Sequence, residues 1–395
     1  MAVDLDKAAT DAHAELHMIL EELGPRESAT TQESEAASYL EGKFLSLGYA
    51  TEIQTFPVIG QELAGMGLTL TTPLSREFVA LPMTKSGLGD VSGILTPVGL
   101  GMPGDMPEDG LQGRVALAIR GVIPFQSKAE NVFAAGAVGL VVYNNVPGIF
   151  QGALAGESEF PVISISDVDG EAITELLADS DSEAQAKASI TLTLEERPSQ
   201  NVIAEKQGAG EFVVVLGGHY DSIPGVSGAN DNASGTAVLL TIAQMLANID
   251  LPFTLRIIPF GSEELGLLGS RFYVDSLTEQ ELANTKAMLN FDALGTGSGV
   301  SIFGAPDLTE MMAGAGKEIG IDIVVTRGLS GGTSDYASFE NVGVPHLMFF
   351  GDDPTRIHSE LDTLEFVQPE MLGGAVASTL ALLQSPEFAD FVNLN

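Results

Sequence analysis

The sequence of 395 residues contains no cysteine. This absence excludes a disulfide, a thiolate nucleophile and a thiolate metal ligand. If the chain binds a metal ion, the ion must therefore be held by His, Asp or Glu side chains.

A run of about 20 uncharged apolar residues, the length that a membrane-spanning helix needs, is also absent. The first residues, MAVDLDKAAT, lack the basic region and the apolar run of an export signal. We therefore expect the chain to have no membrane partner.

Basic residues are scarce: 17 Lys and Arg stand against 54 Asp and Glu, which gives a formal net charge of -37 at pH 7. Most of such a surface repels a phosphate backbone, so we expect no nucleic-acid partner. The same acidity fits either a high-salt or an extracellular environment. Neither the compartment nor the oligomeric state follows from it.

The first 60 residues have regular patterns. Apolar residues recur at helical spacing over residues 5–23, and Gly24-Pro25 stops this helix. A second helix is expected over residues 31–47, followed by an alternating strand over residues 49–56.

The length of the chain favours two domains or one domain with an insertion. The pattern of apolar residues differs between two parts of the chain. Residues 65–195 contain short apolar runs broken by Gly and Pro, which predicts a β-rich inserted domain. Residues 1–64 and 196–395 are expected to form the other domain, in which apolar strands and long helices alternate after Pro198. This alternation predicts an α/β fold, an open sheet with helices on both faces.

Candidate functional residues follow the apolar strands. His219 closes the strand FVVVLGG, and Asp221 could accept the other ring N–H of this histidine. The pair Glu263-Glu264 follows the strand TLRIIPFG, and because neighbouring side chains diverge, one could bind metal while the other orients a water. Read alone, His219 is a structural residue and the two acids are a solvated loop.

Three further residues complete the set. Asp292 ends the strand AMLNFD, and His358 follows a fourth apolar strand. Asp231, in GANDNASG, could cap the following helix or bridge two cations. Because ligands gather at the carboxyl ends of strands in open α/β sheets, we expect these residues to converge. Imidazoles with carboxylates suit zinc, and a shared Asp allows two ions.

The other three histidines have plainer interpretations. His13 and His17 lie at i and i+4 on the first helix without an acidic cluster nearby, and we expect them at the surface. His346 lies inside the apolar strand VPHLMFF and is expected to be buried and hydrogen-bonded.

Several motifs occur in order along the second half of the chain: HYDS, GANDNASG, FGSEELGLLGS, FDALG, TSDYASF and RIHSELDT. They resemble the motifs of the co-catalytic zinc exopeptidases, which include bacterial leucyl aminopeptidases and glutamate carboxypeptidase. The resemblance spans residues 198–385, with a weaker match over residues 1–60. It implies a mixed sheet of the phosphorylase/hydrolase-like fold and a secreted or extracytoplasmic protein.

This resemblance implies roles for single residues. One zinc ion would lie on His219 and Asp292 and a second on Glu264 and His358, with Asp231 bridging both. Glu263 would be the general base, with Asp221 supporting the catalytic site, and the peptide bond after Asp231 would be strained. Asp335 and Tyr336 would line the substrate site.

The segment RGVIPFQSKAENVFAAGAVGLVVYNN is similar to the protease-associated (PA) domain inserted in many of these enzymes. Ile123 stands where such domains often have Cys. Ile357 stands where the bacterial aminopeptidases can have a Tyr that stabilises the oxyanion, a role that could pass to the metals or to Tyr336.

The expected reaction is removal of the N-terminal residue of a peptide with a free α-amine by a metal-activated water. A carboxypeptidase or dipeptidase of the same clan is the first alternative, although the arginines that would bind a substrate carboxylate are few. A glutaminyl cyclase and a metal-free receptor module are further alternatives.

Overall fold

The computed structural model describes residues 4–60, 67–72, 75–178, 187–192, 195–329 and 332–394. It divides into two compact units, one of Met1–Val58 with Pro198–Asn395 and the other of Ile59–Arg197. Of the two domain boundaries expected from the sequence, the one between residues 64 and 65 lies outside the described residues. The other, between residues 195 and 196, falls at the start of a strand, two residues before the division at Pro198.

An eight-stranded sheet forms the centre of the first unit, in the order β1-β10-β12-β11-β13-β16-β14-β15. Strands β12, β11, β13 and β16 are parallel, whereas β10 and β14 run antiparallel to a neighbour, so the sheet is mixed as expected. The strands are β1 (Ala50–Gly60), β10 (Glu195–Lys206), β11 (Val213–His219), β12 (Thr254–Phe260), β13 (Thr285–Phe291), β14 (Ser301–Gly304), β15 (Val324–Val325) and β16 (His346–Phe350).

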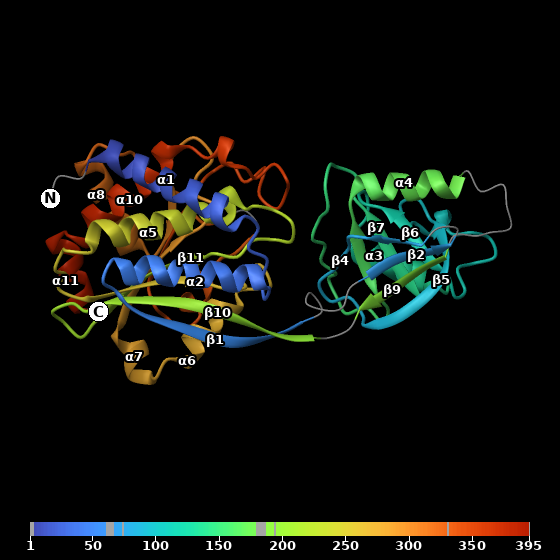
Figure 1. Cartoon of the computed structure of the whole chain (residues 1–395), viewed down its shortest axis with the longest axis horizontal. Helices are drawn as coiled ribbons and strands as arrows, with labels where there is room; N and C mark the ends of the chain where they lie inside the picture. Colours follow the sequence, from blue (N-terminus) through green and yellow to red (C-terminus); the bar gives the residue numbers. More distant parts are fainter. Residues whose placement is uncertain are drawn as a thin grey trace. The chain divides into compact units, whose positions relative to one another are not determined.

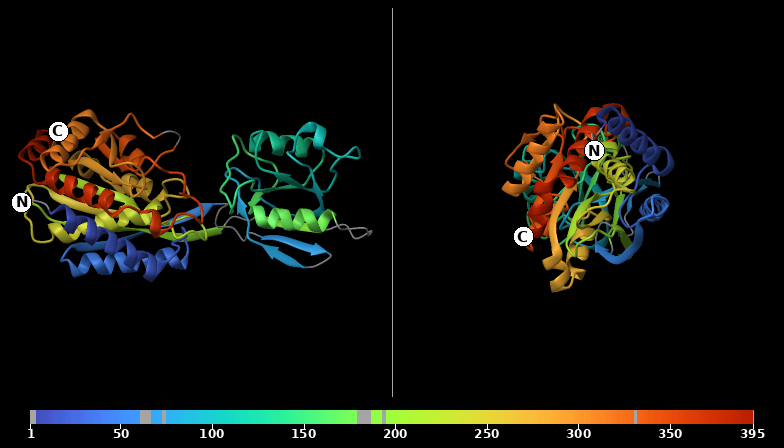
Figure 2. Two further views of the ribbon diagram at one scale, coloured as in Figure 1. Left: turned by 90° about the horizontal axis from the view of Figure 1, so that it is seen from above. Right: turned by 90° about the vertical axis from the view of Figure 1, so that its left-hand side faces the viewer.

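Helices cover both faces of this sheet, which confirms the predicted architecture (Figures 1 and 2). On β11, Val214 and Leu216 pack into one apolar cluster, and Val213 and Val215 pack into another on the opposite face. The first cluster includes residues of α1 (Leu5–Leu23), α2 (Thr31–Ser46), α5 (Gly235–Leu246), α8 (Pro306–Glu318), α10 (Pro369–Leu383) and α11 (Pro386–Leu394). The second includes residues of α6 (Leu268–Ser276), α7 (Glu279–Asn284) and α9 (Tyr336–Glu340).

The first two helices form where the sequence predicts them. Asp4 caps α1 by accepting a hydrogen bond from the Lys7 N–H, and Thr30 caps α2 in the same way through the Glu33 N–H. Helix α1 packs so closely against α10 that a Cβ atom on Gly373 would lie 2.7 Å from the backbone nitrogen of Ala9. The expected strand over residues 49–56 is longer, since β1 runs to Gly60.

The second unit contains its own eight-stranded sheet, in the order β3-β2-β9-β5-β6-β7-β8-β4. Helix α3 (Phe125–Ala134) contributes to the apolar cluster on one face and α4 (Asp167–Ala178) to the cluster on the other. The strands are β2 (Gly67–Thr72), β3 (Arg76–Phe78), β4 (Leu81–Pro82), β5 (Gly89–Pro97), β6 (Val115–Ile119), β7 (Gly139–Tyr143), β8 (Val162–Ile165) and β9 (Lys187–Leu192).

Within the described residues, no helix is long and apolar enough to cross a bilayer.

Candidate metal centre

Strand ends deliver the candidate residues to one edge of the first sheet. His219 is the last residue of β11, Asp292 directly follows β13, and Glu263 and Glu264 follow β12 after a two-residue turn. Because β12, β11 and β13 are parallel neighbours, their carboxyl ends lie side by side. Asp231 approaches this edge from a six-residue turn, Ala229–Ser234, that leads into α5.

Asp231 lies between the two imidazoles. Its Oδ1 atom is 3.1 Å from His219 Nε2, and its Oδ2 atom is 3.1 Å from His358 Nε2. Asp292 Oδ1 lies 3.2 Å from His219 Nε2, and Glu264 Oε2 lies 3.2 Å from His358 Nε2. The five side chains therefore form two groups that share one carboxylate.

The backbone at this point is unusual. The Asp231-Asn232 peptide bond is cis, at the position where the resemblance implied a strained bond. His358 has a φ of +57°, in the left-handed region that residues with side chains seldom adopt. Its side chain is 50% exposed, so the second group is the one open to solvent.

These donors fit zinc ions. Ligand atoms at about 2.0 Å from a tetrahedral zinc are about 3.3 Å apart, close to the separations of 3.1 and 3.2 Å found here. In two sets of three side chains, the possible ligand atoms all lie within 4.8 Å of one another. The first set is His219, Glu263 and Asp292, and the second is His219, Asp231 and Glu264. Glu264 Oε1 is buried and has no hydrogen-bond partner among the described residues, so it remains free to bind a cation.

The electrostatics of the cluster favour positive charge at its centre. Burial alone would raise the pKa of Asp231, but the two imidazoles hold it well below its usual range. Burial and then the Asp231 carboxylate raise the pKa of Glu264 to about 7. Although burial works against it, contact with Asp231 and Glu264 raises the pKa of His358 to about 11. Bound divalent cations would offset the same repulsion between carboxylates.

Asp221 supports the centre from behind. His219 Nδ1 lies 3.2 Å from the Asp221 carbonyl oxygen and 3.4 Å from its Oδ1 atom, so the expected partner residue is in place. The Asp221 carboxylate also accepts the backbone N–H groups of Glu263 (3.1 Å) and Glu264 (3.3 Å) and the hydroxyl of Ser28 (2.6 Å). One carboxylate thus fixes the loop that carries both the expected base, Glu263, and the candidate metal ligand Glu264.

Three buried residues that support the centre were not expected from the sequence. Asp362 accepts the backbone N–H groups of Asn230 (2.7 Å) and Asp231 (3.0 Å). The fully buried Arg26 donates to the carbonyl oxygens of Tyr220, Ser227, Gly228 and Gly24. Glu33 accepts from the backbone and hydroxyl of Ser262, next to Glu263. The Asp362 carboxylate belongs to the motif RIHSELDT, which was a usable signal.

The two residues expected at the substrate site are largely buried. Asp335 has no exposed surface, and neither carboxylate oxygen has a hydrogen-bond partner among the described residues. Burial and neighbouring carboxylates raise the pKa of Asp335 to about 7. The ring of Tyr336 stacks on His346 at 4.7 Å and meets Phe303 edge-on at 5.2 Å. The roles of both residues remain predictions.

Two of the other three histidines lie as expected with respect to burial. His346 is buried against Tyr336 and Phe303. On α1, His17 is exposed and its Nδ1 atom is 3.3 Å from Glu21 Oε2, whereas His13 is half-buried.

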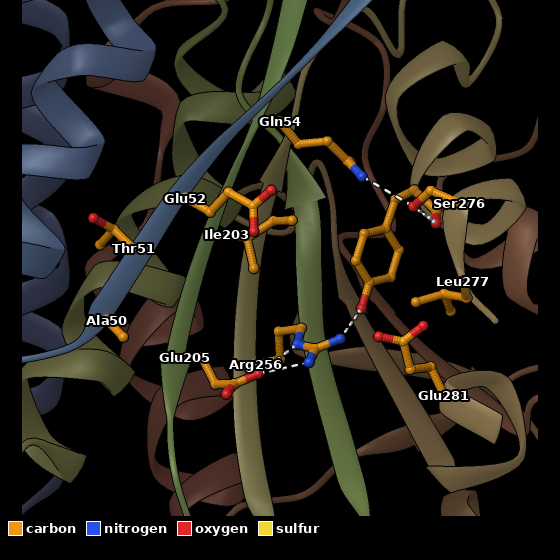
Figure 3. A pocket seen from close by; sticks show the side chains of 11 residues that line it. Ala50, Thr51, Glu52, Gln54, Ile203, Glu205, Arg256, Ser276, Leu277 and Glu281 are labelled. Atoms are coloured by element: carbon orange, nitrogen blue, oxygen red, sulfur yellow. Dashed lines mark hydrogen bonds and ion pairs between the residues drawn. The ribbon is translucent and has the colours of Figure 1, made fainter.

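A cavity of about 340 Å³ lies elsewhere in the first unit, between β1, β10 and β12 and the helices α6 and α7 (Figure 3). Arg256 within it forms an ion pair with Glu205 at 2.6 Å and donates to the Tyr273 hydroxyl at 2.8 Å. Gln54 donates to Ser276 at 3.0 Å. The residues that line this cavity include none of the candidate metal ligands, so it is separate from the candidate site.

An open α/β sheet that gathers imidazoles and carboxylates at its strand ends is the arrangement expected of a metal-dependent enzyme. Comparisons with known proteins identify the family of enzymes. Residues 201–383 match the model of peptidase family M28, and residues 91–173 match that of the PA domain. The chain belongs to peptidase family M28 and carries an inserted PA domain.

Named relatives agree with this assignment. The chain is 31% identical to "Aminopeptidase YwaD" of Bacillus subtilis (strain 168), over 93% of this chain and 83% of that one. It is 33% identical to "Leucine aminopeptidase 2" of Trichophyton equinum, over 83% of this chain but 61% of the relative's length. The structure of BSAP, a zinc aminopeptidase from Bacillus subtilis, superposes with a TM-score of 0.80 at 29% identity and covers 94% of both chains. The expected family and fold class are confirmed.

Asp362→Asn is expected to lower the affinity for zinc by about 10- to 100-fold, the effect usual for partners that orient a metal ligand. Both carboxylate oxygens accept a backbone N–H, so an amide places its NH2 group against one of them. Zinc affinity is measured by competition with a coloured chelator. Asp352→Asn is the matched control, because Asp352 accepts two hydrogen bonds from Ser298 without touching a metal ligand. Equal affinities in the two variants would contradict the prediction.

The chelator-treated protein is expected to lose stability as the pH rises from about 5 to about 8. Burial raises the pKa of Glu33 to about 8 and those of Glu264 and Asp335 to about 7. The folded state therefore keeps protons that the unfolded state releases above pH 4 to 5, and this stability is lost as the pH rises through 7 to 8. We expect the Tm to fall by more than about 5 °C.

The zinc-loaded protein is the control for this pH series. Zinc binds the deprotonated carboxylates, so its Tm should fall less or should rise over the same range. A chelator-treated Tm that does not change between the two pH values would contradict the assigned burial of these carboxyl groups.

Proposed function

We propose that this chain uses two zinc ions to remove the N-terminal residue of peptides. One ion would be held by His219 and Asp292 and the other by Glu264 and His358, and Asp231 would bridge both. Zinc-dependent aminopeptidase activity itself follows from the family and the named relatives. The proposal of a second zinc ion rests on one observation: the two carboxylate oxygens of Asp231 each lie 3.1 Å from a different imidazole. Bound there, zinc would supply an acidified water and would polarise the scissile carbonyl.

Glu263 is the proposed general base. It lies beside the ligand Glu264, and its backbone N–H is fixed by Asp221. Burial raises the pKa of Glu263 well above its usual value; His219 opposes this shift, and the carboxylates of Asp292 and Asp335 add to it. Its carboxylate takes a proton from the attacking water and delivers it to the leaving amine.

Acidic groups also account for recognition of the substrate. The free α-amine of a peptide is a cation, and the carboxylates of Glu263 and Asp292, which come together beside His219, would attract it. Asp335 is proposed to support this region from beneath, because its carboxylate is buried. Tyr336 is the proposed hydrogen-bond donor to the oxyanion, since Ile357 cannot donate one from its side chain.

The carboxypeptidase alternative needs a free cation for the substrate carboxylate. Arg26 donates its guanidinium hydrogens to four carbonyl oxygens, and Arg356 pairs with Asp353 at 3.1 Å. Neither is available, which favours the aminopeptidase. The complete set of candidate ligands likewise argues against a receptor module without metal.

A panel of aminoacyl chromogenic substrates tests this function, with matched N-acetylated substrates as controls. We expect cleavage of substrates with a free amine, with a preference for apolar residues such as Leu, and loss of cleavage with a chelator. Full activity in the chelator, or faster cleavage of the acetylated substrates, would contradict the proposal. Export of the protein from the cytoplasm is a further part of the proposal, and fractionation of the native cells would test it.

A further inference from the structure

Glu33 has an obvious local role in the first turn of α2. Thr30-Thr31-Gln32-Glu33 has the spacing of a capping box, in which a Thr and a Glu three residues later satisfy each other's backbone. The Thr30 hydroxyl accepts the Glu33 N–H at 3.4 Å, and Glu33 Oε2 accepts the Ala29 N–H at 2.7 Å. A capping carboxylate can remain in water, yet Glu33 is 0% exposed.

The other oxygen of Glu33 explains this burial. Glu33 Oε1 accepts the backbone N–H of Ser262 at 2.9 Å and the Ser262 hydroxyl at 3.1 Å, 229 positions away in the sequence. It also accepts the Ser199 hydroxyl at 2.9 Å. Ser262 has a φ of +51°, so two hydrogen bonds to one oxygen hold a residue in the left-handed region.

The loop that carries the proposed base is held at consecutive N–H groups. The Ser262 N–H donates to Glu33, and the N–H groups of Glu263 and Glu264 donate to Asp221. On the far side, the carbonyl oxygen of Glu263 accepts the N–H groups of Gly266 (2.7 Å) and Leu267 (2.8 Å). The backbone of Glu263 is therefore fixed from both directions.

Gly261 shows how closely the loop approaches Glu33. A Cβ atom on Gly261 would lie 2.9 Å from Glu33 Oε1, 2.7 Å from Ser199 Oγ and 2.5 Å from the Gln200 carbonyl oxygen. Because these contacts are shorter than a side chain tolerates, the approach depends on a residue without one.

We propose that Glu33 is a positioning residue for the general base, acting through Ser262 to set the orientation of Glu263. Taking a carboxyl group out of water costs more free energy than a helix cap returns, so capping alone does not account for its place. The contacts with Ser262 supply the missing reason. This inference rests on the proposed role of Glu263 as the base.

Glu33→Gln tests the proposal with nearly unchanged volume. Each carboxylate oxygen accepts a backbone N–H, from Ala29 or from Ser262, so either orientation of the amide leaves one N–H facing an NH2 group. We expect kcat to fall by about 10- to 100-fold, which is the usual effect of a small displacement of a catalytic group. KM should stay within about twofold, and the zinc content per chain should not change.

Two further variants separate positioning from loss of structure. Thr30→Ala removes the cap but leaves the Ser262 contacts, so it should lower the Tm without changing kcat. In a Glu263→Gln background, Glu33→Gln should lower kcat by less than about twofold, because the residue through which it acts has lost its function. Equal losses of kcat in Thr30→Ala and Glu33→Gln would overturn the proposal.

The outcomes distinguish this inference from the proposed function. If Glu263→Gln is inactive while Glu33→Gln keeps its kcat, the positioning role is overturned and the function stands. If Glu263→Gln itself keeps full activity, the proposed base is wrong. Should Glu33→Gln not fold, Ser262→Ala removes one of the two donors and keeps the carboxylate. It should then lower kcat severalfold at unchanged KM, and an unchanged kcat would overturn the inference.

Discussion

Glu263→Gln is expected to lower kcat by about 10²- to 10⁴-fold, the usual contribution of a general base. The amide keeps the shape of the side chain and cannot take a proton from water. Since Glu264 rather than Glu263 approaches His358, the variant should retain the wild-type zinc content. Steady-state kinetics on a chromogenic aminoacyl substrate, with zinc measured in the same sample, checks both parts.

Glu279→Gln is the control for the first prediction, because it makes the same chemical change on the exposed surface of α7. It should leave kcat unchanged. Wild-type turnover in Glu263→Gln would assign the proton transfer to another group.

Asp231→Asn is expected to lower activity by more than about a hundredfold, beyond the effect of residues that only orient a ligand. Both carboxylate oxygens of Asp231 face an imidazole, so the amide presents one oxygen where two are needed. The zinc content should fall from two ions to one or fewer. Because bound zinc stabilises the folded state, the Tm should fall as well, by mass action.

Asp250→Asn, at an exposed position after α5, is the matched control for the bridging carboxylate. It should keep both zinc ions and the wild-type Tm. If Asp231→Asn also keeps two zinc ions, then Asp231 does not bridge them.

The sequence is enough to expect that the candidate residues lie together, because most of them are tied to strand ends. His219, Asp292 and the pair Glu263-Glu264 follow apolar strands, and the strands are parallel neighbours in the sheet. One rule about parallel sheets therefore brings together residues that are far apart in the sequence. The sequence did not predict that β10 and β14 run antiparallel to a neighbour, because an apolar strand has the same pattern in either direction.

The supporting residues were harder to predict, for a physical reason. Arg26 and Glu33 act on backbone groups about 200 positions away, and a backbone N–H or carbonyl has no sequence pattern. Glu33 even carries the signature of a different role, the capping box, although its carboxylate accepts the N–H of Ala29 and the cap itself is made by Thr30. Burial of Asp335 was likewise invisible, because a motif places a residue near a site without telling whether water reaches it.

Stepwise removal of zinc from the purified protein with a chelator tests whether two ions support the reaction. The zinc-to-chain ratio is measured by mass spectrometry of the metal at each step, together with the aminopeptidase rate. We expect two zinc ions per chain in the fully active protein and loss of the rate as they are removed. Full activity in protein that holds no zinc would contradict this expectation.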